Sequence, residues 1–441
     1  MYDCAKFPPA MHSILRLHVR RHLRVFSSLL LGASAASAET PSWTGWRGPT
    51  RDAQVKRFVP PEVWPEKLES VWKVEVGEGY STPLVVGGKV FQYARQQGEE
   101  VLWCLDRKTG KSMWRRNTKV DFEAGSGGER HGLGPKSTPV FADGRVFTLS
   151  ITGVLAGWSA EDGMPLWQRD FRERFDVSHP YWGTATSPVV EGGRLYAHTG
   201  SCEKGALFCI DPKTGKDLWV RDEDANCYSS PLVETIDGVR QLVEFNHAGL
   251  CGIDLENGSL LWKHPFSHRG NNQNTPTPVR HGDMLIAGGE NRGVFGVRPK
   301  RVDGQWSVEP VWQHRLVSID MNSPVVNDEL VYGFSHLKMG RIFCLDPGTG
   351  TILWEGEPRA GENGQFLSIP GHVLALTDGG LLQVLRANRQ AFDIARSYRV
   401  AEDGTWTAPA LVDDALLIKD RNHLALWRLP GRMAGGPEKD E

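Results

Sequence analysis

The residues best suited to form a binding site stand at a fixed distance before a series of regularly spaced prolines. Three residues before each proline lie Tyr80, Lys136, Ala185, Tyr228, Thr275, Met321, Leu367 and Trp406. Four of these eight are aromatic or cationic, which are types that can stack on a ligand or pair with its charge. We therefore take Tyr80, Lys136, Tyr228 and Trp406 as candidate ligand-binding residues. For the two tyrosines, which share the context Tyr-Ser-Ser/Thr-Pro, a packing role in a repeat is the open alternative.

A second group of candidates is polar and lies in neighbouring loops. The run 271–274 reads Asn-Asn-Gln-Asn and offers amide donors and acceptors without charge, as recognition of a sugar or a peptide backbone requires. Arg292 stands in a similar loop, between the expected second and third strands of its repeat. We take Asn271, Asn274 and Arg292 as candidates, with a polar turn as the alternative for the asparagines.

Motifs for catalysis or metal binding are missing. The chain has no Cys-x-x-Cys pair and no Cys/His spacing typical of zinc sites. Residues 125–134 are rich in glycine but lack the strand and helix context of a phosphate-binding loop. A Ser/His/Asp triad is recognised by geometry, and none can be selected from sequence position. We assign no catalytic or metal-binding residue.

One pattern recurs along the chain after residue 70 and must position the candidates. Each copy opens at a proline, most often after Thr or Ser, continues through strand-like segments, turns at a glycine and ends at an aromatic residue. Seven intervals between openings cover 326 residues, or about 47 per repeat, which is the length of a propeller blade. We predict an all-β, eight-bladed β-propeller of four-stranded antiparallel blades over residues 71–430. The openings are Pro83, Pro139, Pro188, Pro231, Pro278, Pro324, Pro370 and Pro409.

The turn before the last strand is the most specific part of the pattern. An Asp precedes a Gly by four residues at 106–110, 211–215, 254–258 and 346–350. We expect this Asp to bind the loop backbone and the Gly to adopt a positive φ. The Trp that follows the Gly is expected on the outer strand, packed against a neighbour. These tryptophans are Trp114, Trp167, Trp219, Trp262 and Trp354.

Closure of the ring is predicted from Trp72. Trp312 and Tyr398 take the outer position in the fifth and seventh repeats, which leaves the last repeat without one. The segment around Trp72 precedes the first opening, and we expect it to pair with three C-terminal strands around 410–429. Residues 39–70 would then be a Trp- and Pro-rich lead-in, and residues 431–441 a disordered tail.

Residues 1–38 are typical of an export signal. Four arginines precede a short apolar stretch, and Ala36-Ser37-Ala38 supplies the small residues of a cleavage site. Removing five basic and one acidic residue from totals of 51 and 53 changes the net charge from −2 to −6. We expect cleavage after Ala38 and a periplasmic or secreted chain, with no transmembrane segment and no charge excess for nucleic acid. The choice between general and twin-arginine export, and between Met1 and Met11 as the start, stays open.

Six cysteines follow the leader. Cys104, Cys209 and Cys344 hold one place in three repeats, where other repeats have Gly, so we expect small buried residues there. Cys202 and Cys227 have no counterpart in the repeats. A disulfide involving these two is an open alternative, because an exported compartment permits it.

The segment 104–114, Cys-Leu-Asp-Arg-Lys-Thr-Gly-Lys-Ser-Met-Trp, and its copy at 209–219 closely resemble the repeat named for pyrroloquinoline quinone (PQQ) dehydrogenases. The lead-in Trp43–Asp52 also resembles the start of exported PQQ-like propellers. The chain is identified as a member of the PQQ-like β-propeller family of exported bacterial proteins. That family is similar in architecture to the outer-membrane β-barrel assembly lipoprotein and to quinoprotein alcohol dehydrogenases. Fold alone does not decide between such functions.

The resemblance implies either a binding module or a dehydrogenase. The family's alcohol dehydrogenases carry adjacent cysteines over PQQ and a calcium ion on carboxylate and Asn ligands, but this chain has no Cys-Cys pair. We therefore expect a non-catalytic, monomeric module at the cell envelope that binds an envelope protein or a small polar ligand. The alternative is a PQQ- and calcium-dependent enzyme that oxidises an alcohol or sugar. Function beyond architecture is expected to involve the tryptophans outside the repeats, Trp43, Trp46, Trp182 and Trp406.

Overall fold

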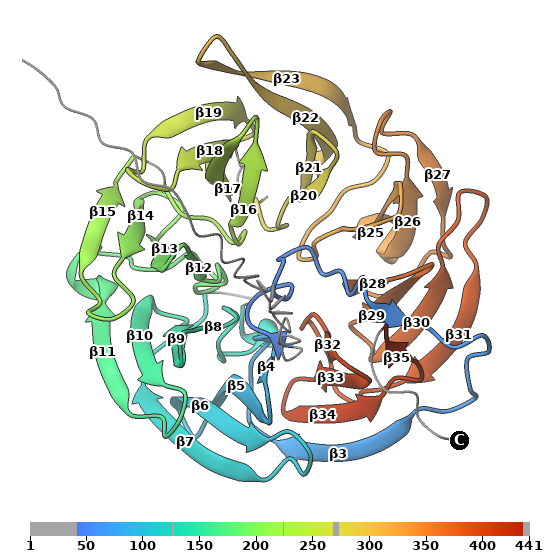
Figure 1. Ribbon diagram of the computed structural model, residues 1–441, viewed down its shortest axis with the longest axis horizontal. Helices are drawn as coiled ribbons and strands as arrows, with labels where there is room; N and C mark the ends of the chain where they lie inside the picture. Colours follow the sequence, from blue (N-terminus) through green and yellow to red (C-terminus); the bar gives the residue numbers. More distant parts are fainter. Residues whose placement is uncertain (1–41, 126–127, 224, 268–272, 435–441) are drawn as a thin grey trace, which may run out of the picture. The chain divides into compact units, whose positions relative to one another are not determined.

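The computed structural model describes residues 42–125, 128–223, 225–267 and 273–434. All of them belong to the larger of two units, residues 40–441, whereas residues 1–39, with the expected signal peptide, lie outside the described residues. In the larger unit, eight sheets surround a common axis as the blades of a propeller (Figure 1). The predicted all-β, eight-bladed architecture is confirmed.

Each blade is an antiparallel sheet whose first strand lies nearest the axis. Blades 1 and 2 are β4 (Leu84–Val86), β5 (Lys89–Gln96), β6 (Glu99–Asp106), β7 (Ser112–Lys119), then β8 (Val140–Ala142), β9 (Arg145–Leu149), β10 (Val154–Ser159), β11 (Pro165–Asp170). Blades 3 and 4 are β12 (Val189–Glu191), β13 (Arg194–Gly200), β14 (Gly205–Ile210), β15 (Asp217–Arg221), then β16 (Leu232–Ile236), β17 (Val239–Asn246), β18 (Gly249–Asp254), β19 (Leu260–Pro265). Blades 5 and 6 are β20 (Val279–His281), β21 (Met284–Gly289), β22 (Gly293–Val302), β23 (Gln305–His314), then β24 (Val325–Asn327), β25 (Leu330–Ser335), β26 (Arg341–Leu345), β27 (Ile352–Glu355). Blades 7 and 8 are β28 (Gly364–Ile369), β29 (His372–Thr377), β30 (Leu381–Arg386), β31 (Ile394–Arg399), then β32 (Ala410–Val412), β33 (Ala415–Lys419), β34 (His423–Arg428) and β3 (Glu69–Glu75).

Blade 8 joins the two ends of the propeller. Its outer strand, β3, comes from the N-terminal side and pairs antiparallel with β34, with Trp72 opposite Leu426. The indole Nε1 of Trp72 then donates to Arg107 O of blade 1 at 2.9 Å. The predicted closure by the strand around Trp72 is confirmed, and it leaves no open sheet edge between the first and last blades.

At five junctions between blades, an outer tryptophan packs on the predicted glycine turn of the next blade. Gly110 has φ 68°, and a Cβ on it would lie 2.8 Å from the ring of Trp72. A side chain is therefore excluded by both conformation and space. Asp106 Oδ1 accepts the backbone N–H of Thr109 at 2.9 Å, as expected for the turn. The same ring-on-glycine contact recurs at Trp114–Gly163, Trp167–Gly215, Trp219–Gly258 and Trp312–Gly350.

The small residues of the third strands lie beneath these tryptophans. Cys104 pairs in register with Trp114, and Cys209 and Cys344 pair with the corresponding tryptophans of their blades. All three cysteines are buried. Their expected role as small buried residues is confirmed, and at the equivalent Gly157 even a Cβ would lie 2.8 Å from the ring of Trp167.

Two predicted boundaries need correction. Pro370 does not open the seventh blade, since it follows the end of β28 and lies in the turn to β29. The true opening of this blade has no proline, so counting from the nearest one misplaced it. The tail also begins later than predicted: β35 (Arg432–Met433) pairs with β2 (Phe58–Val59) of the lead-in. Residues 435–441 lie outside the described residues.

The lead-in is a structural part of the propeller. Its strand β1 (Ser42–Trp43) pairs with β4 of blade 1, and Thr44 O accepts the N–H of Phe141 in blade 2 at 2.8 Å. Arg51 Nη2 donates to Val190 O of blade 3 at 2.6 Å. Arg47 Nη2 and Val55 N reach carbonyls of blades 6 and 7. The segment 42–55 therefore crosses the axis and joins opposite sides of the ring.

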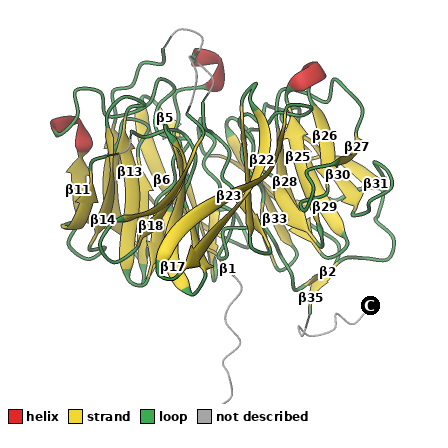
Figure 2. Cartoon of the chain, turned by 90° about the horizontal axis from the view of Figure 1, so that it is seen from above, coloured by secondary structure: helices red, strands yellow, loops and turns green. Residues whose placement is uncertain are grey.

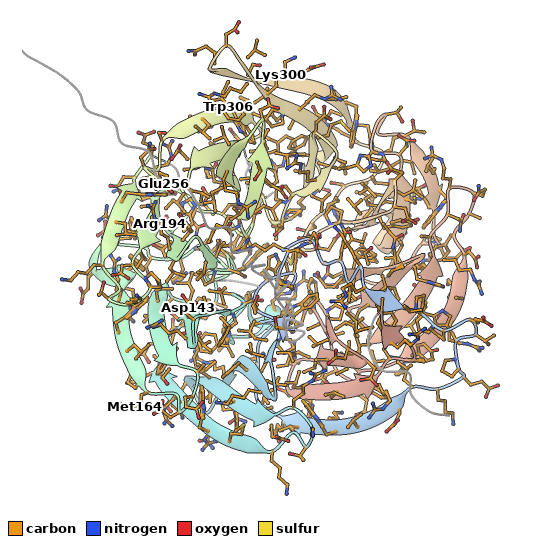
Figure 3. The ribbon with its side chains drawn as sticks, in the orientation of Figure 1. Asp143, Met164, Arg194, Glu256, Lys300 and Trp306 are labelled. Atoms are coloured by element: carbon orange, nitrogen blue, oxygen red, sulfur yellow. The ribbon has the colours of Figure 1, made fainter. Side chains whose placement is uncertain are left out.

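The two faces of the ring differ. The short helices η1 (Glu129–His131), η2 (Phe171–Glu173) and η3 (Leu337–Met339) lie at one face, and the β2–β35 sheet lies at the other (Figure 2). Around the rim, ion pairs such as Arg194–Glu256 at 2.6 Å connect blades, and the long hairpin that carries Lys300 and Trp306 projects outward (Figure 3). Among the described residues, no helix has the length and apolar content needed to cross a bilayer.

Candidate functional site

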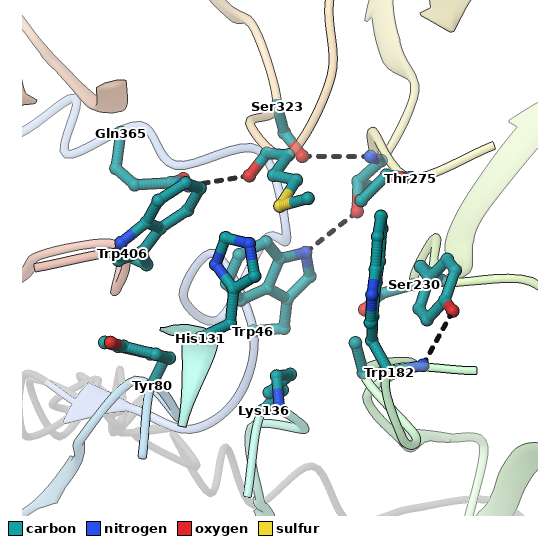
Figure 4. A pocket seen from close by; sticks show the side chains of 14 residues that line it. Trp46, Tyr80, His131, Lys136, Trp182, Ser230, Thr275, Ser323, Gln365 and Trp406 are labelled. Atoms are coloured by element: carbon teal, nitrogen blue, oxygen red, sulfur yellow. Dashed lines mark hydrogen bonds between the residues drawn. The ribbon is translucent and has the colours of Figure 1, made fainter. Parts of the chain in front are cut away.

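A cavity lies on the axis of the ring, and His131 of η1 in its lining places it at the face that carries the short helices. Figure 4 shows its lining side chains from close by. Its volume is about 840 Å³ when space open to solvent is included. Every blade contributes to its wall, and the lead-in contributes its floor. The lining residues are Trp46, Tyr80, His131, Lys136, Trp182, Ala185, Tyr228, Ser230, Thr275, Thr277, Met321, Ser323, Gln365 and Trp406.

Most of the predicted ring of residues before the opening prolines lines this cavity. Of the eight positions, only that of Leu367 fails, because this residue is fully buried in the apolar core. It was counted from Pro370, which is not an opening. Gln365 lines the cavity from blade 7 in its place. The four candidates Tyr80, Lys136, Tyr228 and Trp406 are thus brought together.

A chain of hydroxyl contacts keeps these loops in register. In four blades, the Ser or Thr before the opening proline donates its backbone N–H to the hydroxyl oxygen of the equivalent residue in the next blade. Thr82 N donates to Thr138 Oγ1 at 3.0 Å, and Thr138 N donates to Ser187 Oγ at 3.0 Å. The same contact joins Thr277 N to Ser323 Oγ at 2.9 Å. The frequent Thr-Pro and Ser-Pro openings therefore have a structural cause, and they orient the residue two positions earlier.

Trp46 closes the floor of the cavity. Its indole Nε1 donates to Thr277 Oγ1 at 2.9 Å, so the ring is held across the axis (Figure 4). The next residue, Arg47, is buried and donates to Pro324 O at 2.7 Å. Burial lowers the pKa of Arg47 to about 10, with Asp52 opposing the shift. The cavity is therefore a cup closed by the lead-in.

Aromatic rings form two walls that meet at His131. The imidazole ring packs edge-on against Trp406 with centroids 4.8 Å apart and lies 6.1 Å from Trp182. Trp182 in turn packs on Tyr228, whose hydroxyl accepts the backbone N–H of Trp182 at 3.1 Å. Burial, with repulsion from Arg130, Lys136 and Arg421, lowers the pKa of His131 to about 4. The histidine is thus a neutral wall residue at physiological pH.

Lys136 supplies the positive charge of the cavity. Its ammonium donates to Gly132 O at 3.2 Å and lies 5.9 Å from the centroid of the Phe122 ring. Burial lowers the pKa of Lys136 to about 8, while Glu78 and Glu100 oppose the shift. The described lining residues include no carboxylate. The cup therefore combines aromatic faces with one cation.

A buried carboxyl group lies behind Lys136, between blades 1 and 2. Glu100 Oε2 accepts the hydroxyl of Tyr93, and Glu100 Oε1 accepts the N–H of Ile151 at 3.0 Å. Burial raises the pKa of Glu100 to about 7 despite these hydrogen bonds. The folded state therefore holds a proton that the unfolded chain releases near its ordinary pKa.

Stability is expected to fall as the pH rises because of Glu100. The contribution of Glu100 to the free energy of unfolding is complete below the pKa of this group in the unfolded chain. About 3 kcal/mol of it is lost as the pH rises from about 4.5 to 7. Denaturant unfolding at pH 5 and pH 8 measures this difference. Glu100→Gln should reduce the difference in the free energy of unfolding between pH 5 and pH 8 by about 3 kcal/mol. The exposed control variant Glu66→Gln should leave that difference unchanged. A difference as large in Glu100→Gln as in the wild type would contradict the assignment.

The candidates Asn274 and Arg292 form hydrogen bonds within the protein, outside the cavity. Asn274 Nδ2 donates to Asn246 O at 2.7 Å, and Asn274 Oδ1 accepts from Arg292 Nη2 at 2.6 Å. The guanidinium of Arg292 lies 4.5 Å from the centroid of Phe266. The structure therefore does not place Asn274 and Arg292 in the cavity lining. Asn271 lies outside the described residues.

The cavity also contains residues that were not selected as candidates. Trp46 and Trp182 had been noted only as tryptophans outside the repeats, together with Trp406, which does line the cavity. Trp43 differs, because it is 2% exposed and packs against Gly48. His131 lies in the glycine-rich segment 125–134, which lacks the strand and helix context of a phosphate-binding loop. Only the irregular position of these aromatic residues in the repeat signalled them.

The PQQ and calcium implied by the resemblance do not match this lining. PQQ carries several carboxylates, whereas the lining offers one lysine as its charged partner. Calcium takes about six to eight oxygen ligands, commonly carboxylates, and none of the described lining residues is Asp, Glu or Asn. No two of the described cysteines are consecutive in the sequence. We therefore derive no step through this cofactor.

One group in the described part of the chain has metal-like spacing. Ligand atoms of Asp403, Asp420 and His423 lie within 4.8 Å of one another, but none of these residues lines the cavity. Asp420 Oδ1 already accepts the backbone N–H of Asn422 at 2.9 Å and of His423 at 2.6 Å. The ammonium of Lys419 lies in the same loop, so a cation of the protein accompanies these carboxylates.

Comparison with known proteins gives a consistent family. The family model PQQ_2, described as outer membrane protein assembly factor BamB, matches residues 98–356, more than half of the chain. Outer membrane protein assembly factor BamB of Shewanella oneidensis is 23% identical over 391 residues, covering 82% of this chain and 89% of that protein. The crystal structure of BamB from Moraxella catarrhalis has a TM-score of 0.60 at 14% identity, covering 82% of this chain and 98% of that one.

Dehydrogenases are also among the relatives. The 1-butanol dehydrogenase (cytochrome c) of Thauera butanivorans is 25% identical over 330 residues. The match covers 69% of this chain but only 44% of that protein. More than half of the dehydrogenase therefore has no counterpart in the aligned region.

Proposed function

This chain belongs to the family described as outer membrane protein assembly factor BamB, and from that premise we propose that it is an exported scaffold of the cell envelope. It would bind another envelope protein through the face that carries the axial cavity and would not catalyse a reaction. The observation that carries this proposal is the cup itself: aromatic residues around one lysine, without a carboxylate among the described lining residues.

The face around the cavity has further features of a binding surface. Tyr181, Leu316 and Met339 are 52%, 68% and 67% exposed. The first two lie in loops and Met339 lies in η3, at the same end of the blades as the cavity. Lys338 and Met339 both have positive φ, a strained conformation that tends to occur at functional positions. Exposed apolar residues around a polar-rimmed cup favour contact with a protein.

The charge of the cup defines the partner's chemistry. Lys136 lies inside it, and Arg130 stands at its edge with a side chain that is 66% exposed and lies 3.8 Å from the carboxylate of Glu362. Arg421 Nη2 donates to Arg130 O at 2.7 Å and adds a second guanidinium there. We propose that the partner inserts an aromatic or apolar side chain next to a carboxylate, because these groups complement the aromatic walls and the cations.

Photocrosslinking in the native envelope tests this surface. A photoreactive residue at position 181 or 339 should form an adduct with one envelope protein, whereas the same residue at 164 or 218, exposed on the rim, should not. Trp406→Ala should reduce the adduct at least about tenfold, since a central aromatic contact is worth about 2 kcal/mol or more. Equal adducts from the rim positions, or no effect of Trp406→Ala, would contradict the proposed surface.

The cellular location and assembly state complete the proposal. An exported chain cleaved after Ala38 should begin at Glu39, and intact mass spectrometry of protein from the envelope fraction reads this directly. Light scattering of the purified protein should give the mass of a monomer, because the closed ring leaves no free sheet edge between blades. A leader retained in the exported protein would contradict the expected cleavage.

A further inference from the structure

Two cysteines that have no place in the repeats lie together next to the cavity. Cys202 stands in the loop between β13 and β14, and Cys227 directly precedes the cavity residue Tyr228. Both thiols donate to the same acceptor, Gln273 Oε1, at 3.5 and 3.3 Å. The single S–H of Cys202 can also turn from Gln273 to Cys227 Sγ, which then accepts it. The two sulfur atoms are therefore neighbours although the residues belong to different loops.

The surroundings differ from those of the packing cysteines. Cys104, Cys209 and Cys344 each face a tryptophan, in three different blades. Cys227 is 1% exposed, whereas Cys202 is only partly buried and can be reached from solvent. One accessible thiol next to a second, shielded thiol is an arrangement typical of redox-sensitive cysteines.

The shielded sulfur is also polarised by its neighbours. Cys227 Sγ accepts the backbone N–H of Asn274 at 3.2 Å. Burial alone would raise the pKa of Cys227, but hydrogen bonds from Cys202 and Asn274 bring it below its ordinary value. Cys202 therefore keeps its proton to a higher pH than Cys227 does, because the hydrogen bond with Cys227 raises the pKa of Cys202. A sulfur with this character is a good internal nucleophile.

We propose that Cys202 and Cys227 form a reversible disulfide that fixes one wall of the axial cavity. The co-reactant is a disulfide oxidant, such as an envelope dithiol–disulfide exchange protein. Solvent base takes the proton of Cys202, and the resulting thiolate attacks one oxidant sulfur, so the oxidant's S–S bond breaks and a mixed disulfide forms. Cys227 then displaces the oxidant's sulfur from Cys202. The two cysteines lose two protons and two electrons, and the oxidant leaves as two thiols.

The bond would act on the cavity through Tyr228. Tyr228 follows Cys227 and packs on Trp182, with ring centroids 5.8 Å apart. Its hydroxyl oxygen accepts the backbone N–H of Trp182. Oxidation would remove both S–H donors from Gln273 and tie the loop of Cys202 to the segment before Tyr228. The cavity wall would then be held by a covalent bond in place of two hydrogen bonds. An oxidising compartment rests on the proposed export, whereas the thiol chemistry itself does not.

The test uses the purified full-length protein after exposure to oxidised dithiothreitol. We expect a loss of two alkylatable thiols and of about 2 Da, with peptide mapping that links Cys202 to Cys227. Cys202→Ser and Cys227→Ser should each abolish this loss, whereas the packing variant Cys104→Ser should retain it. Trp fluorescence should change between the oxidised and reduced wild type and stay constant in Cys202→Ser.

Two results would overturn the proposal. Both cysteines could stay fully alkylatable under conditions that oxidise a vicinal-dithiol peptide, or the bond could form between other cysteines. Neither result depends on a protein partner. Failure of the crosslinking experiment therefore leaves the disulfide standing, and failure of the thiol assay leaves the scaffold function standing.

Discussion

Deletion of residues 71–76 is expected to abolish the cooperative unfolding transition. These residues form most of β3, the outer strand of blade 8, and their loss would leave β34 as an open edge. Trp72, which bridges to Arg107 of blade 1, would go with them. Loss of one buried Trp alone costs about 3–5 kcal/mol, against a total stability of about 5–15 kcal/mol for a typical domain.

Thermal unfolding followed by circular dichroism measures this effect. The single variant Trp72→Ala should lower stability by about 3–5 kcal/mol. Trp306→Ala, in the projecting hairpin of blade 5, serves as the control and should cost clearly less because that side chain is only half-buried. A deleted chain that unfolds in one transition at the wild-type temperature would show that β3 does not close the ring.

Lys419→Met is expected to cause the second large loss of stability. Lys419 is 1% exposed, and the three N–H groups of its ammonium are shared among four backbone carbonyls, those of Gly77, Gly79, Asp420 and Arg421, at 2.5–3.0 Å. The first two belong to the segment that leads from β3 into blade 1, and the others to the loop before β34. The lysine therefore ties the two sides of the ring closure together. Methionine keeps the apolar stem but leaves the carbonyls without their donor.

The expected cost is about 3–5 kcal/mol, because removing one partner leaves buried polar groups unsatisfied. Denaturant unfolding of Lys419→Met and of exposed Lys108→Met as a control gives this number. Lys108→Met should stay within about 0.5 kcal/mol of the wild type. If Lys419→Met were equally neutral, the four carbonyls would not depend on the ammonium, and this part of the account would be wrong.

The blades could be predicted because their determinants are local. Asp106 and Gly110 fix a turn within five residues, and the Trp that follows fits over the glycine of the next blade. Even the closure by Trp72 followed from counting outer aromatic residues. Blade 7 lacks such a local determinant, because no proline directly precedes its first strand. Leu367 was wrongly expected in the cavity because it was counted back from Pro370, which lies in the turn after β28.

The cavity was predicted in outline but not in its floor. Tyr80 and Tyr228 stand three residues before an opening proline, and the repeated loop orients them toward the axis. Their place in the cavity could therefore be predicted by counting back from the prolines. Trp46 reaches the cavity only because the lead-in crosses the axis to Thr277, a contact between residues 231 positions apart. His131 depends in the same way on packing against Trp406. Such long-range contacts have no local signature in one sequence.

We propose that this propeller binds a partner and does not oxidise a substrate with PQQ. The most direct measurement adds PQQ and calcium to the purified protein, removes unbound quinone, and records quinone absorbance and alcohol-dependent dye reduction. A quinoprotein alcohol dehydrogenase treated in parallel shows that the assay works. We predict no retained quinone and no dye reduction above a protein-free control. Stoichiometric quinone together with alcohol-dependent dye reduction would contradict the account.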